Sequence, residues 1–384
     1  MEKIIVAGSG FAGATIARKL ADAGYMVEIF ERREQIGGNA YDYIDKSMSY
    51  VHKYGPHIFH TNIDRVFEFL SNYTEWFKYE HKVLGSIDGQ LVPIPFSLKS
   101  LEMLFPKEKA LELKNKLIEK FGLNNKVTIS ELRKENDPDL IELSDYVYNK
   151  VFLNYTKKQW DLLPEQLGEN VTGRVPVYVS YDEKYFQDKY QFMPKEGYTK
   201  LFERMLQHDN IKIHLGVDIL DEISIKDSVI EYKNDPDCKI IYTGCIDELF
   251  GYMYGELEYR SLDFQFESLD KETYQPAAVV NYPNDNLYTR ITEFKNFTVE
   301  NATNISNNTT IVKEYPCKYQ KGMIPYYPIP LKPCEDKYKK YYDYSNNFKN
   351  LYLIGRLAEY KYYNMDLVIN SALDIADRII KGEI

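Results

Sequence analysis

A glycine-rich turn near the N-terminus constrains the fold more than any other stretch of the chain. Residues 4–7 read as a short buried strand that runs directly into Gly8-Ser9-Gly10-Phe11-Ala12-Gly13. A helical pattern follows over residues 14–23, and a second predicted strand over 27–30 ends on Glu31. Strand, G-x-G-x-x-G turn, helix and second strand in this order predict a βαβ unit that binds a dinucleotide.

Each residue type in this unit is explained by what its position requires. Gly8 permits a tight turn, Gly10 lets the backbone approach a pyrophosphate, and Gly13 lets helix and strand pack closely. The start of the helix then points its unpaired N–H groups at the anion. A carboxylate at Glu31 can accept hydrogen bonds from a ribose diol and repels a 2′-phosphate. We therefore expect an adenine dinucleotide without that phosphate.

Length and composition limit the class of protein. A chain of 384 residues exceeds the size at which one hydrophobic core usually keeps growing, so we expect two or three subdomains. The sequence contains no run of 18 apolar residues, and its first residues enter the predicted strand without the pattern of a signal peptide. We expect a cytoplasmic protein that does not bind a membrane.

Charge and cysteine usage exclude further classes. The net charge of −10 argues against a nucleic-acid partner, because phosphate backbones are bound by clustered Lys and Arg. The four cysteines show no C-x-x-C spacing and do not cluster with the six histidines. We expect four reduced thiols, and neither a metal site nor a disulfide framework.

The order of the predicted elements indicates a discontinuous fold. Residues 82–95 read as a hairpin around Asp88-Gly89, residues 98–151 as charged helices, and the tyrosine-rich stretch 178–192 as β-structure. Short alternating strands follow between 259 and 315. The predicted class is α/β: a discontinuous Rossmann-like domain (1–80, 198–250 and 335–384) with an inserted helical subdomain (97–165) and an antiparallel β-sheet subdomain (81–96, 166–197 and 251–334).

Further motifs give the chain a resemblance to one enzyme family. They are Gly37-Gly38-Asn39, Tyr54-Gly55-Pro56-His57-Ile58-Phe59-His60-Thr61, Tyr155-Thr156-Lys157-Lys158-Gln159-Trp160, Tyr288-Thr289-Arg290-Ile291-Thr292-Glu293, Ile324-Pro325-Tyr326-Tyr327-Pro328-Ile329, and Gly355-Arg356-Leu357 with Met365-Asp366. With these motifs, nearly the whole chain resembles bacterial UDP-galactopyranose mutases. The resemblance implies an FAD-binding domain and an enzyme that interconverts UDP-galactopyranose and UDP-galactofuranose. It also implies that FAD is active when reduced and that its N5 forms a covalent adduct with sugar C1, without net redox change.

The resemblance assigns roles to individual residues. Arg174 and Arg290 match the two arginines that stabilise the departing diphosphate, and His57 matches a histidine beside the flavin; these three are the predicted catalytic residues. Arg174 lies in a stretch that reads as a mobile lid. The predicted cofactor-binding residues are Gly8, Gly10, Ala12, Gly13, Glu31, Arg32, Gly38, Asn39, His57, Ile58, Val217, Arg356, Asn364, Met365, Asp366, Leu367 and Val368. The predicted substrate-binding residues are His81, Phe152, Tyr155, Trp160, Arg174, Tyr185, Asn281, Arg290, Tyr327 and Tyr362.

Two positions depart from the family pattern and leave the identity of the substrate's sugar undecided. His81 stands where close bacterial relatives carry asparagine near the substrate, and Asn364 stands where aspartate is usual. UDP-galactose and UDP-N-acetylgalactosamine therefore both remain candidate substrates, although His57 follows the galactose-type pattern and favours UDP-galactose. The resemblance also implies a homodimer.

Two other functions share the glycine fingerprint. A flavin amine oxidase or related desaturase carries the same turn and would consume oxygen while it oxidises its substrate. A binding protein like the GDI regulators of prenylated GTPases has the fold without the flavin and would be colourless. Neither alternative accounts for the arginine and tyrosine motifs.

Overall fold

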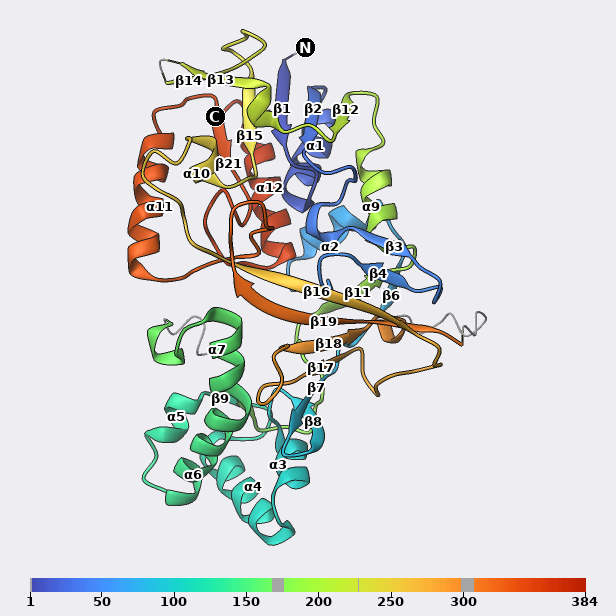
Figure 1. Ribbon diagram of the computed structural model, residues 1–384, viewed down its shortest axis with the longest axis vertical. Helices are drawn as coiled ribbons and strands as arrows, with labels where there is room; N and C mark the ends of the chain where they lie inside the picture. Colours follow the sequence, from blue (N-terminus) through green and yellow to red (C-terminus); the bar gives the residue numbers. More distant parts are fainter. Residues whose placement is uncertain (1, 168–175, 227, 298–306) are drawn as a thin grey trace.

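The computed structural model describes residues 2–167, 176–226, 228–297 and 307–384. The molecule is elongated: a five-stranded sheet with its helices forms one end, a group of helices forms the other, and a seven-stranded sheet lies between them (Figure 1). The predicted α/β class with a Rossmann-like domain is confirmed.

The five-stranded sheet is parallel throughout and has the order β12-β2-β1-β15-β21. Its strands come from three separate stretches of the chain. They are β1 (Lys3–Ala7), β2 (Met26–Glu31), β12 (Ile211–Leu215), β15 (Lys239–Tyr242) and β21 (Leu351–Leu353). Each of these strands lies within the sequence-predicted nucleotide segments.

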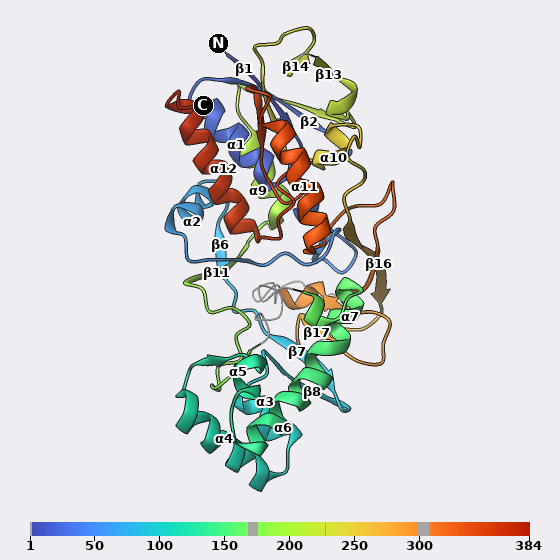
Figure 2. The same cartoon turned by 90° about the vertical axis from the view of Figure 1, so that its left-hand side faces the viewer.

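Helices cover both faces of this sheet, which explains why its central strand is apolar on both sides. Ile4 and Val6 pack on the face covered by α1 (Phe11–Asp22), α9 (Gly197–Leu206) and α12 (Met365–Ile380). Ile5 and Ala7 pack on the opposite face, towards α10 (Ile246–Leu249) and α11 (Lys332–Ser345). The two groups of helices lie on opposite sides of the strands in Figure 2.

The turn after β1 shows why glycine is required at two positions. Gly8 has φ +93°, a conformation that side chains with a Cβ rarely adopt. A Cβ on Gly13 would lie 2.0 Å from the carbonyl oxygen of Gly8, so helix α1 could not approach the turn. The close packing predicted from Gly13 is confirmed.

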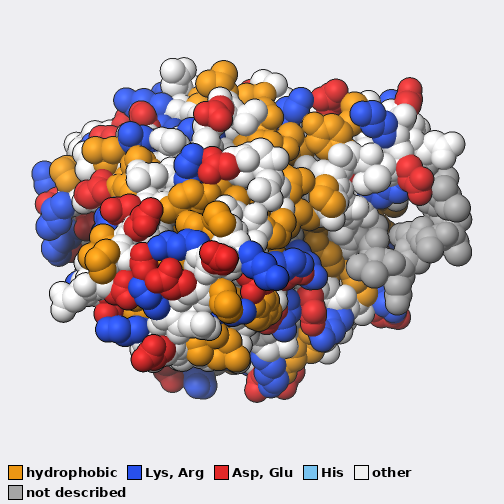
Figure 3. All heavy atoms as spheres, turned by 90° about the horizontal axis from the view of Figure 1, so that it is seen from below, with side chains coloured by type: hydrophobic (Ala, Val, Ile, Leu, Met, Phe, Trp, Pro, Cys, Tyr) orange, Lys and Arg blue, Asp and Glu red, His pale blue; other side chains and the backbone are white. Residues whose placement is uncertain are grey.

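The helical end consists of α3 (Leu98–Leu104), α4 (Lys107–Phe121), α5 (Ile129–Arg133), α6 (Pro138–Val147) and α7 (Asn154–Trp160). A π-helical turn, Tyr148–Leu153, joins α6 to α7 at the end of the stretch 98–151 that the sequence predicts to be helical. Basic and acidic side chains are interspersed over the lower face (Figure 3).

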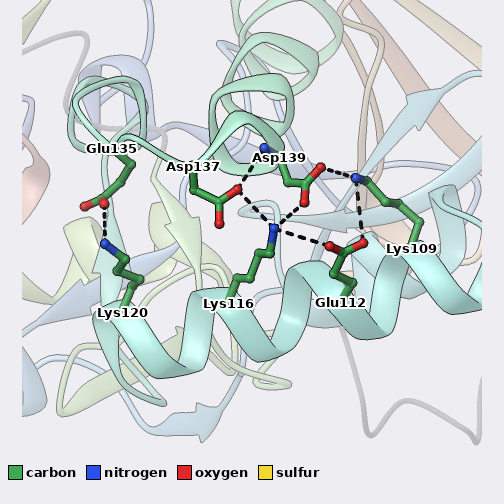
Figure 4. A network of polar contacts seen from close by, with 7 residues as sticks. All are labelled: Lys109, Glu112, Lys116, Lys120, Glu135, Asp137 and Asp139. Atoms are coloured by element: carbon green, nitrogen blue, oxygen red, sulfur yellow. Dashed lines mark hydrogen bonds and ion pairs between the residues drawn. The ribbon is translucent and has the colours of Figure 1, made fainter.

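A network of ion pairs fastens the start of α6 to α4 (Figure 4). Lys116 contacts Asp137 at 3.0 Å, Glu112 at 3.3 Å, and Asp139. Lys109 also contacts Asp139, and Lys120 contacts Glu135 at 2.8 Å. Hydrogen bonds from Lys109 and Lys116 lower the pKa of Asp139, and the same contacts raise the pKa of Lys116.

The seven-stranded sheet has the order β20-β16-β19-β18-β17-β7-β8. Its strands are β7 (Val83–Ile87), β8 (Gln90–Ile94), β16 (Tyr259–Leu269), β17 (Val279–Asn281), β18 (Arg290–Glu293), β19 (Thr309–Lys318) and β20 (Tyr327–Pro328). The predicted hairpin at 82–95 is confirmed. One detail differs from the expected antiparallel sheet: β17 and β7 are parallel, because they are distant in sequence and no tight turn fixes their direction.

Smaller pairs complete the fold. They are β3 (Asp42–Ile44) with β4 (Tyr50–His52), β9 (Lys126–Val127) with β10 (Val177–Tyr178), β13 (Ile223–Lys226) with β14 (Val229–Tyr232), and a sheet of β5 (Phe59–Thr61), β11 (Tyr190–Pro194) and β6 (Trp76–Lys78). Helix α2 (Asp64–Ser71) follows β5. The prediction that 178–192 is β-structure is wrong for residues 181–189, which are irregular and place Tyr185 and Phe186 against a cavity.

Candidate active site

A cavity of ≈780 Å³ is lined by residues of both large sheets. The carboxyl ends of β1, β2 and β15 form one end, as expected for ligand sites of parallel sheets. Residues of β17, β18 and β19 form the other end. The cavity brings together most of the predicted site residues: Gly8, Gly10, Ala12, Glu31, Arg32, Gly38, Asn39, His57, Ile58, His81, Tyr155, Tyr185, Asn281, Arg290, Tyr327, Arg356, Tyr362, Asn364, Met365 and Val368.

Two glycines from different loops meet at the nucleotide end. A Cβ on Gly38 would lie 2.8 Å from the Cα of Gly10, and a Cβ on Gly10 would lie 3.6 Å from the Cα of Gly38. Gly10 is also the residue at which helix α1 starts. Bare backbone from two loops and a helix N-terminus therefore border the cavity here, which fits the pyrophosphate of a dinucleotide.

Glu31 lies at the end of β2 and fixes the glycine turn. Its Oε2 accepts hydrogen bonds from the amide of Ser9 at 3.0 Å and from the Ser9 hydroxyl at 2.7 Å. Its Oε1 accepts one from the amide of Arg33 at 3.0 Å. The carboxylate is therefore held in one orientation beside the cavity.

Arg33 is a cavity residue that the sequence reasoning missed in favour of Arg32. The guanidinium of Arg33 stacks 4.1 Å from the ring centre of Tyr54, and its Nη2 donates to Asn39 at 2.9 Å. Its Nη1 is buried and has no hydrogen-bond partner among the described residues. Arg32, in contrast, is half-exposed and pairs with Glu248 at 3.0 Å and Asp218 at 3.4 Å. The motif that contains Tyr54 was the sequence signal that could have pointed to Arg33, since an aromatic ring can stack on a guanidinium.

His57 lies in the middle of the cavity as a neutral side chain. Its Nδ1 is 2.8 Å from the carbonyl oxygen of Gly55, so Nδ1 carries the proton and Nε2 is an acceptor. Its amide donates to Nδ1 of His52 at 2.9 Å. Burial, with smaller effects from His52 and Arg356, lowers the pKa of His57 to about 4. At neutral pH this histidine can accept a hydrogen bond but supplies no positive charge.

Arg290 carries the positive charge at the other end of the cavity. Its Nη2 donates to the hydroxyl of Tyr155 at 2.9 Å, and its Nε lies 3.4 Å from Oε2 of Glu314. Burial disfavours the charged guanidinium, but the attraction of Glu314 outweighs it and keeps the pKa of Arg290 well above its usual value. Burial raises the pKa of Tyr155 to about 12, so its hydroxyl stays neutral.

Some buried polar atoms around Arg290 lack a hydrogen-bond partner among the described residues. Oδ1 of Asn281, Oε1 of Glu314 and Nε of Arg290 are buried and make no hydrogen bond to any described residue. Asn281 and Arg290 are cross-strand neighbours on β17 and β18. Because buried polar groups are nearly always hydrogen-bonded, this cluster fits a polar ligand that supplies both donors and acceptors.

An aromatic group surrounds the guanidinium of Arg356 between these two ends. That guanidinium lies 5.5 Å from the ring centre of Tyr327 and 5.3 Å from that of Tyr362. It is anchored by donation to the carbonyl oxygens of Tyr326 at 3.3 Å and Tyr363 at 3.0 Å. Trp160 does not line the cavity but lies behind this group, with ring centres 5.9 Å from Tyr327 and 5.8 Å from Tyr362.

His81 is buried beside the polar end. Its Nδ1 lies 3.3 Å from the hydroxyl of Tyr79, and its ring centre lies 5.8 Å from those of Tyr185 and Phe186. Burial, with smaller effects from Arg290 and His60, lowers the pKa of His81 to about 3. His81 is therefore neutral.

Other predicted site residues lie away from the cavity lining. Phe152 packs in the hydrophobic core with its ring 6.0 Å from that of Tyr148, and Leu367 is 47% exposed. Asp366 accepts a hydrogen bond from Thr61 at 2.9 Å. Val217 donates its amide to the carbonyl oxygen of Glu31 at 3.1 Å, and Gly13 packs against the glycine turn. Arg174 lies outside the described residues, so its predicted place on a lid stays a prediction.

Comparison with known proteins identifies the family. The family model "UDP-galactopyranose mutase" matches residues 150–362, and the model "NAD(P)-binding Rossmann-like domain" matches residues 6–73. The chain is 35% identical to the "Probable UDP-galactopyranose mutase" of Klebsiella pneumoniae over 99% of this chain and 95% of that protein. The chain belongs to the UDP-galactopyranose mutase family. The resemblance seen in the sequence is thus confirmed.

Other relatives of the mutase family show both its fold and its breadth. The chain is 33% identical to a dTDP-fucopyranose mutase of Escherichia coli, over 100% of this chain and 99% of that protein. A crystal structure of reduced UDP-galactopyranose mutase superposes with a TM-score of 0.71, at 16% identity and over 99% and 96% of the two chains. As a member of this family the chain is an isomerase of the pyranose–furanose type with a flavoprotein fold.

Proposed function

We propose that this enzyme interconverts UDP-galactopyranose and UDP-galactofuranose with the help of reduced FAD. One observation supports this assignment above the others. A single cavity joins a glycine cradle suited to a dinucleotide with a half-buried arginine, Arg290, whose neighbours Asn281 and Glu314 each carry a buried oxygen without a hydrogen bond to any described residue. The first end suits the cofactor, and the second suits a charged and hydroxylated substrate.

The residues of the nucleotide end fit FAD. Gly8, Gly10 and Gly38 would let the pyrophosphate approach the backbone, while Glu31 would face the adenosine ribose. The unpartnered Nη1 of Arg33 is a donor that an anionic or carbonyl group could satisfy. Met365 and Val368, at the start of α12, line the cavity where the flavin ring would lie. A reduced flavin bound here supplies a nucleophilic N5 for the sugar carbon C1, with no net redox change.

The chain's own residues bind and orient the nucleotide sugar. Arg290, with Arg174 as its predicted partner, would neutralise the diphosphate as it leaves C1 and hold it for return. Tyr155 keeps Arg290 in place through its hydroxyl. Asn281 and Glu314 offer buried acceptors to sugar hydroxyls. Because His57 is neutral, its Nε2 can accept a hydrogen bond from a ligand, and the ring does not repel the positive charge of Arg356.

The sugar specificity is part of the proposal. We assign UDP-galactose as the preferred substrate, because His57 follows the galactose-type pattern. UDP-N-acetylgalactosamine is the competing substrate, and dTDP-fucopyranose is a third, since a mutase of that name is 33% identical to this chain. A cytoplasmic homodimer completes the proposal. The family resemblance supports the homodimer, and four cysteines that are free thiols support the cytoplasmic location.

The decisive experiment measures conversion of UDP-galactofuranose to the pyranose form, with and without dithionite, by chromatography of the nucleotide sugars. We expect conversion only under reducing conditions and a yellow oxidised protein. UDP-N-acetylgalactosamine and dTDP-fucopyranose are tested in parallel. Lack of conversion of UDP-galactofuranose by the reduced protein would refute the proposal. Oxygen consumption with substrate oxidation would indicate the amine oxidase alternative, and a colourless protein the GDI-like one.

In the described residues no helix combines the length and the apolar character that a membrane crossing needs.

A further inference from the structure

Lys158 of α7 occupies a cage of backbone oxygens. Its ammonium group donates to the carbonyl oxygens of Tyr282, Asn284 (3.4 Å), Asn286 (3.0 Å) and Tyr288 (3.2 Å). All four belong to the loop between β17 and β18. An ammonium group has three donors and no acceptor, so a ring of carbonyls matches its chemistry.

This loop connects two residues of the active site. Asn281 ends β17 and Arg290 starts β18, and the two face each other across the strand pair. The amide of Tyr282 donates to the carbonyl oxygen of Thr289 at 2.8 Å, which closes the loop at its base. The shape of the loop therefore sets the place of Arg290.

The helix that carries Lys158 also carries the partner of Arg290. Tyr155 and Lys158 are three residues apart on α7, so their side chains share one face of the helix. The far side of this segment is fixed as well. Buried Arg260 of β16 donates to the carbonyl oxygens of Gln159 at 2.9 Å and Lys158 at 3.1 Å. Asn284 also joins the loop to the helical segment, since it accepts from Asn154 at 3.4 Å and donates to the carbonyl oxygen of Lys150 at 3.0 Å. Lys158 differs from these contacts because its one ammonium group reaches four backbone carbonyls of the β17–β18 loop.

We propose that Lys158 is a positioning residue that fixes the 282–288 loop against α7 and thereby sets the contact between Arg290 and Tyr155. This inference rests on the proposed function, because it assigns Arg290 the work of binding the diphosphate. Lys158 is not among the residues that line the cavity.

Loss of the ammonium group would leave converging carbonyl dipoles without a donor. Such carbonyls repel one another, and each would need a hydrogen bond from water, which requires the loop to move away from α7. The side chain of Lys158 is half-buried, and burial lowers its pKa to about 8, whereas Asp285 raises it. The carbonyl cage therefore holds a cation that has given up part of its hydration.

The test compares Lys158→Ala with Lys157→Ala in the full-length, FAD-loaded enzyme. Lys157 is the exposed neighbour on the same helix. We expect Lys158→Ala to lower kcat/KM for UDP-galactofuranose about 10- to 100-fold, since a displacement near 1 Å has an effect of that size. The loss should lie in kcat more than in KM, because Arg290 acts on the departing diphosphate. Lys157→Ala should stay within about twofold of the wild type.

Rescue by an added amine separates positioning from a general loss of stability. Propylammonium replaces the atoms that Lys158→Ala removes, so it should restore at least about a fifth of the lost kcat. Tetramethylammonium at the same ionic strength has no N–H group and should restore nothing. If Lys158→Ala does not fold, Lys158→Met keeps the alkyl chain and should show the same loss of kcat without rescue.

Hydrogen exchange of the amides of 282–289 gives a readout that does not depend on catalysis. Faster exchange in Lys158→Ala, reversed by propylammonium, supports the proposal that Lys158 fixes the 282–288 loop against α7, which we call the clamp. Unchanged exchange together with an unchanged kcat in Lys158→Ala overturns it. A wild-type protein that lacks mutase activity refutes the proposed function, and the exchange data then decide whether the clamp exists.

Discussion

The hydroxyl of Tyr155 accepts a hydrogen bond of 2.9 Å from Nη2 of Arg290. This contact joins helix α7 to strand β18 at the polar end of the cavity. It uses one of the N–H donors of the guanidinium, while Nε lies 3.4 Å from Oε2 of Glu314.

Tyr155→Phe should lower kcat/KM about tenfold or more, because a hydrogen bond to a charged group contributes about 1.5–3 kcal/mol. Steady-state kinetics with UDP-galactofuranose measure this change. Tyr342→Phe is the matched control, since Tyr342 lies on the exposed side of α11. Equal kinetics for both variants would show that Tyr155 does not hold Arg290.

Arg290→Lys should lower kcat about 10²- to 10³-fold, the range observed when one electrostatic stabiliser is removed. A lysine keeps the charge but cannot contact Tyr155, Glu314 and a diphosphate through one planar group. Arg65→Lys is the control, because Arg65 makes an exposed ion pair with Asp374. An active Arg290→Lys enzyme would reduce the role of Arg290 to simple charge.

Gly10→Ala and Gly13→Ala should separate cofactor binding from folding. A Cβ on Gly10 meets only Gly38, at an ordinary contact distance of 3.6 Å, but it enters the space left for the pyrophosphate. We expect a folded, colourless protein. A Cβ on Gly13 collides with Gly8 at 2.0 Å, so this variant should not fold stably. Flavin absorbance and circular dichroism measure the two effects, and a yellow Gly10→Ala protein would contradict the cradle.

Mild acid should destabilise the protein through its buried histidines. Burial lowers the pKa of His52 to about 3 and that of His81 to about 3, whereas unfolded histidine titrates near 6.5. Below about pH 6.5 these histidines bind protons in the unfolded chain but stay neutral in the folded one. The stability present at higher pH is therefore lost as the pH falls towards the folded pKa values. At pH 5.5 each of these histidines costs about 1.4 kcal/mol.

Substitution of His81 by asparagine tests this acid sensitivity. His81→Asn removes one of the buried histidines, so its free energy of unfolding should fall less between pH 7.5 and 5.5, by about 1.4 kcal/mol. Urea titrations at the two pH values measure the difference. The same pH dependence in both proteins would mean that His81 is not held neutral in the fold.

The nucleotide end was predictable because its residues are close in sequence. Gly8, Gly13 and Glu31 belong to one βαβ unit, whose geometry follows from local spacing. The choice between Arg32 and Arg33 was not predictable in this way. Both side chains line the cavity, but Arg32 forms ion pairs with Glu248 and Asp218, whereas Tyr54, from a different loop, stacks on Arg33.

The polar end depended on contacts between distant strands. Glu314 is a neighbour of Arg290 only through the register of β18 and β19. The family motifs located Arg290, but Glu314 lies outside them and was missed. The cage around Lys158 has no sequence signal, because its ligands are backbone oxygens that every residue carries. Helix α7 was not predicted as a separate helix, because the π-helical turn before it interrupts the regular helical spacing of apolar residues.

The order in which the parallel sheet is assembled has a consequence for the synthesis of the protein. Helix α1 is among the first elements to leave the ribosome, and Ile16 and Leu20 on it are fully buried in the finished molecule. Helix α12, the last element of the chain, packs against α1 beside α9, and β21 is made only shortly before α12. A nascent chain therefore leaves the part of α1 that α12 covers exposed for nearly the whole of translation, and such exposed apolar surface favours aggregation until α12 has been released.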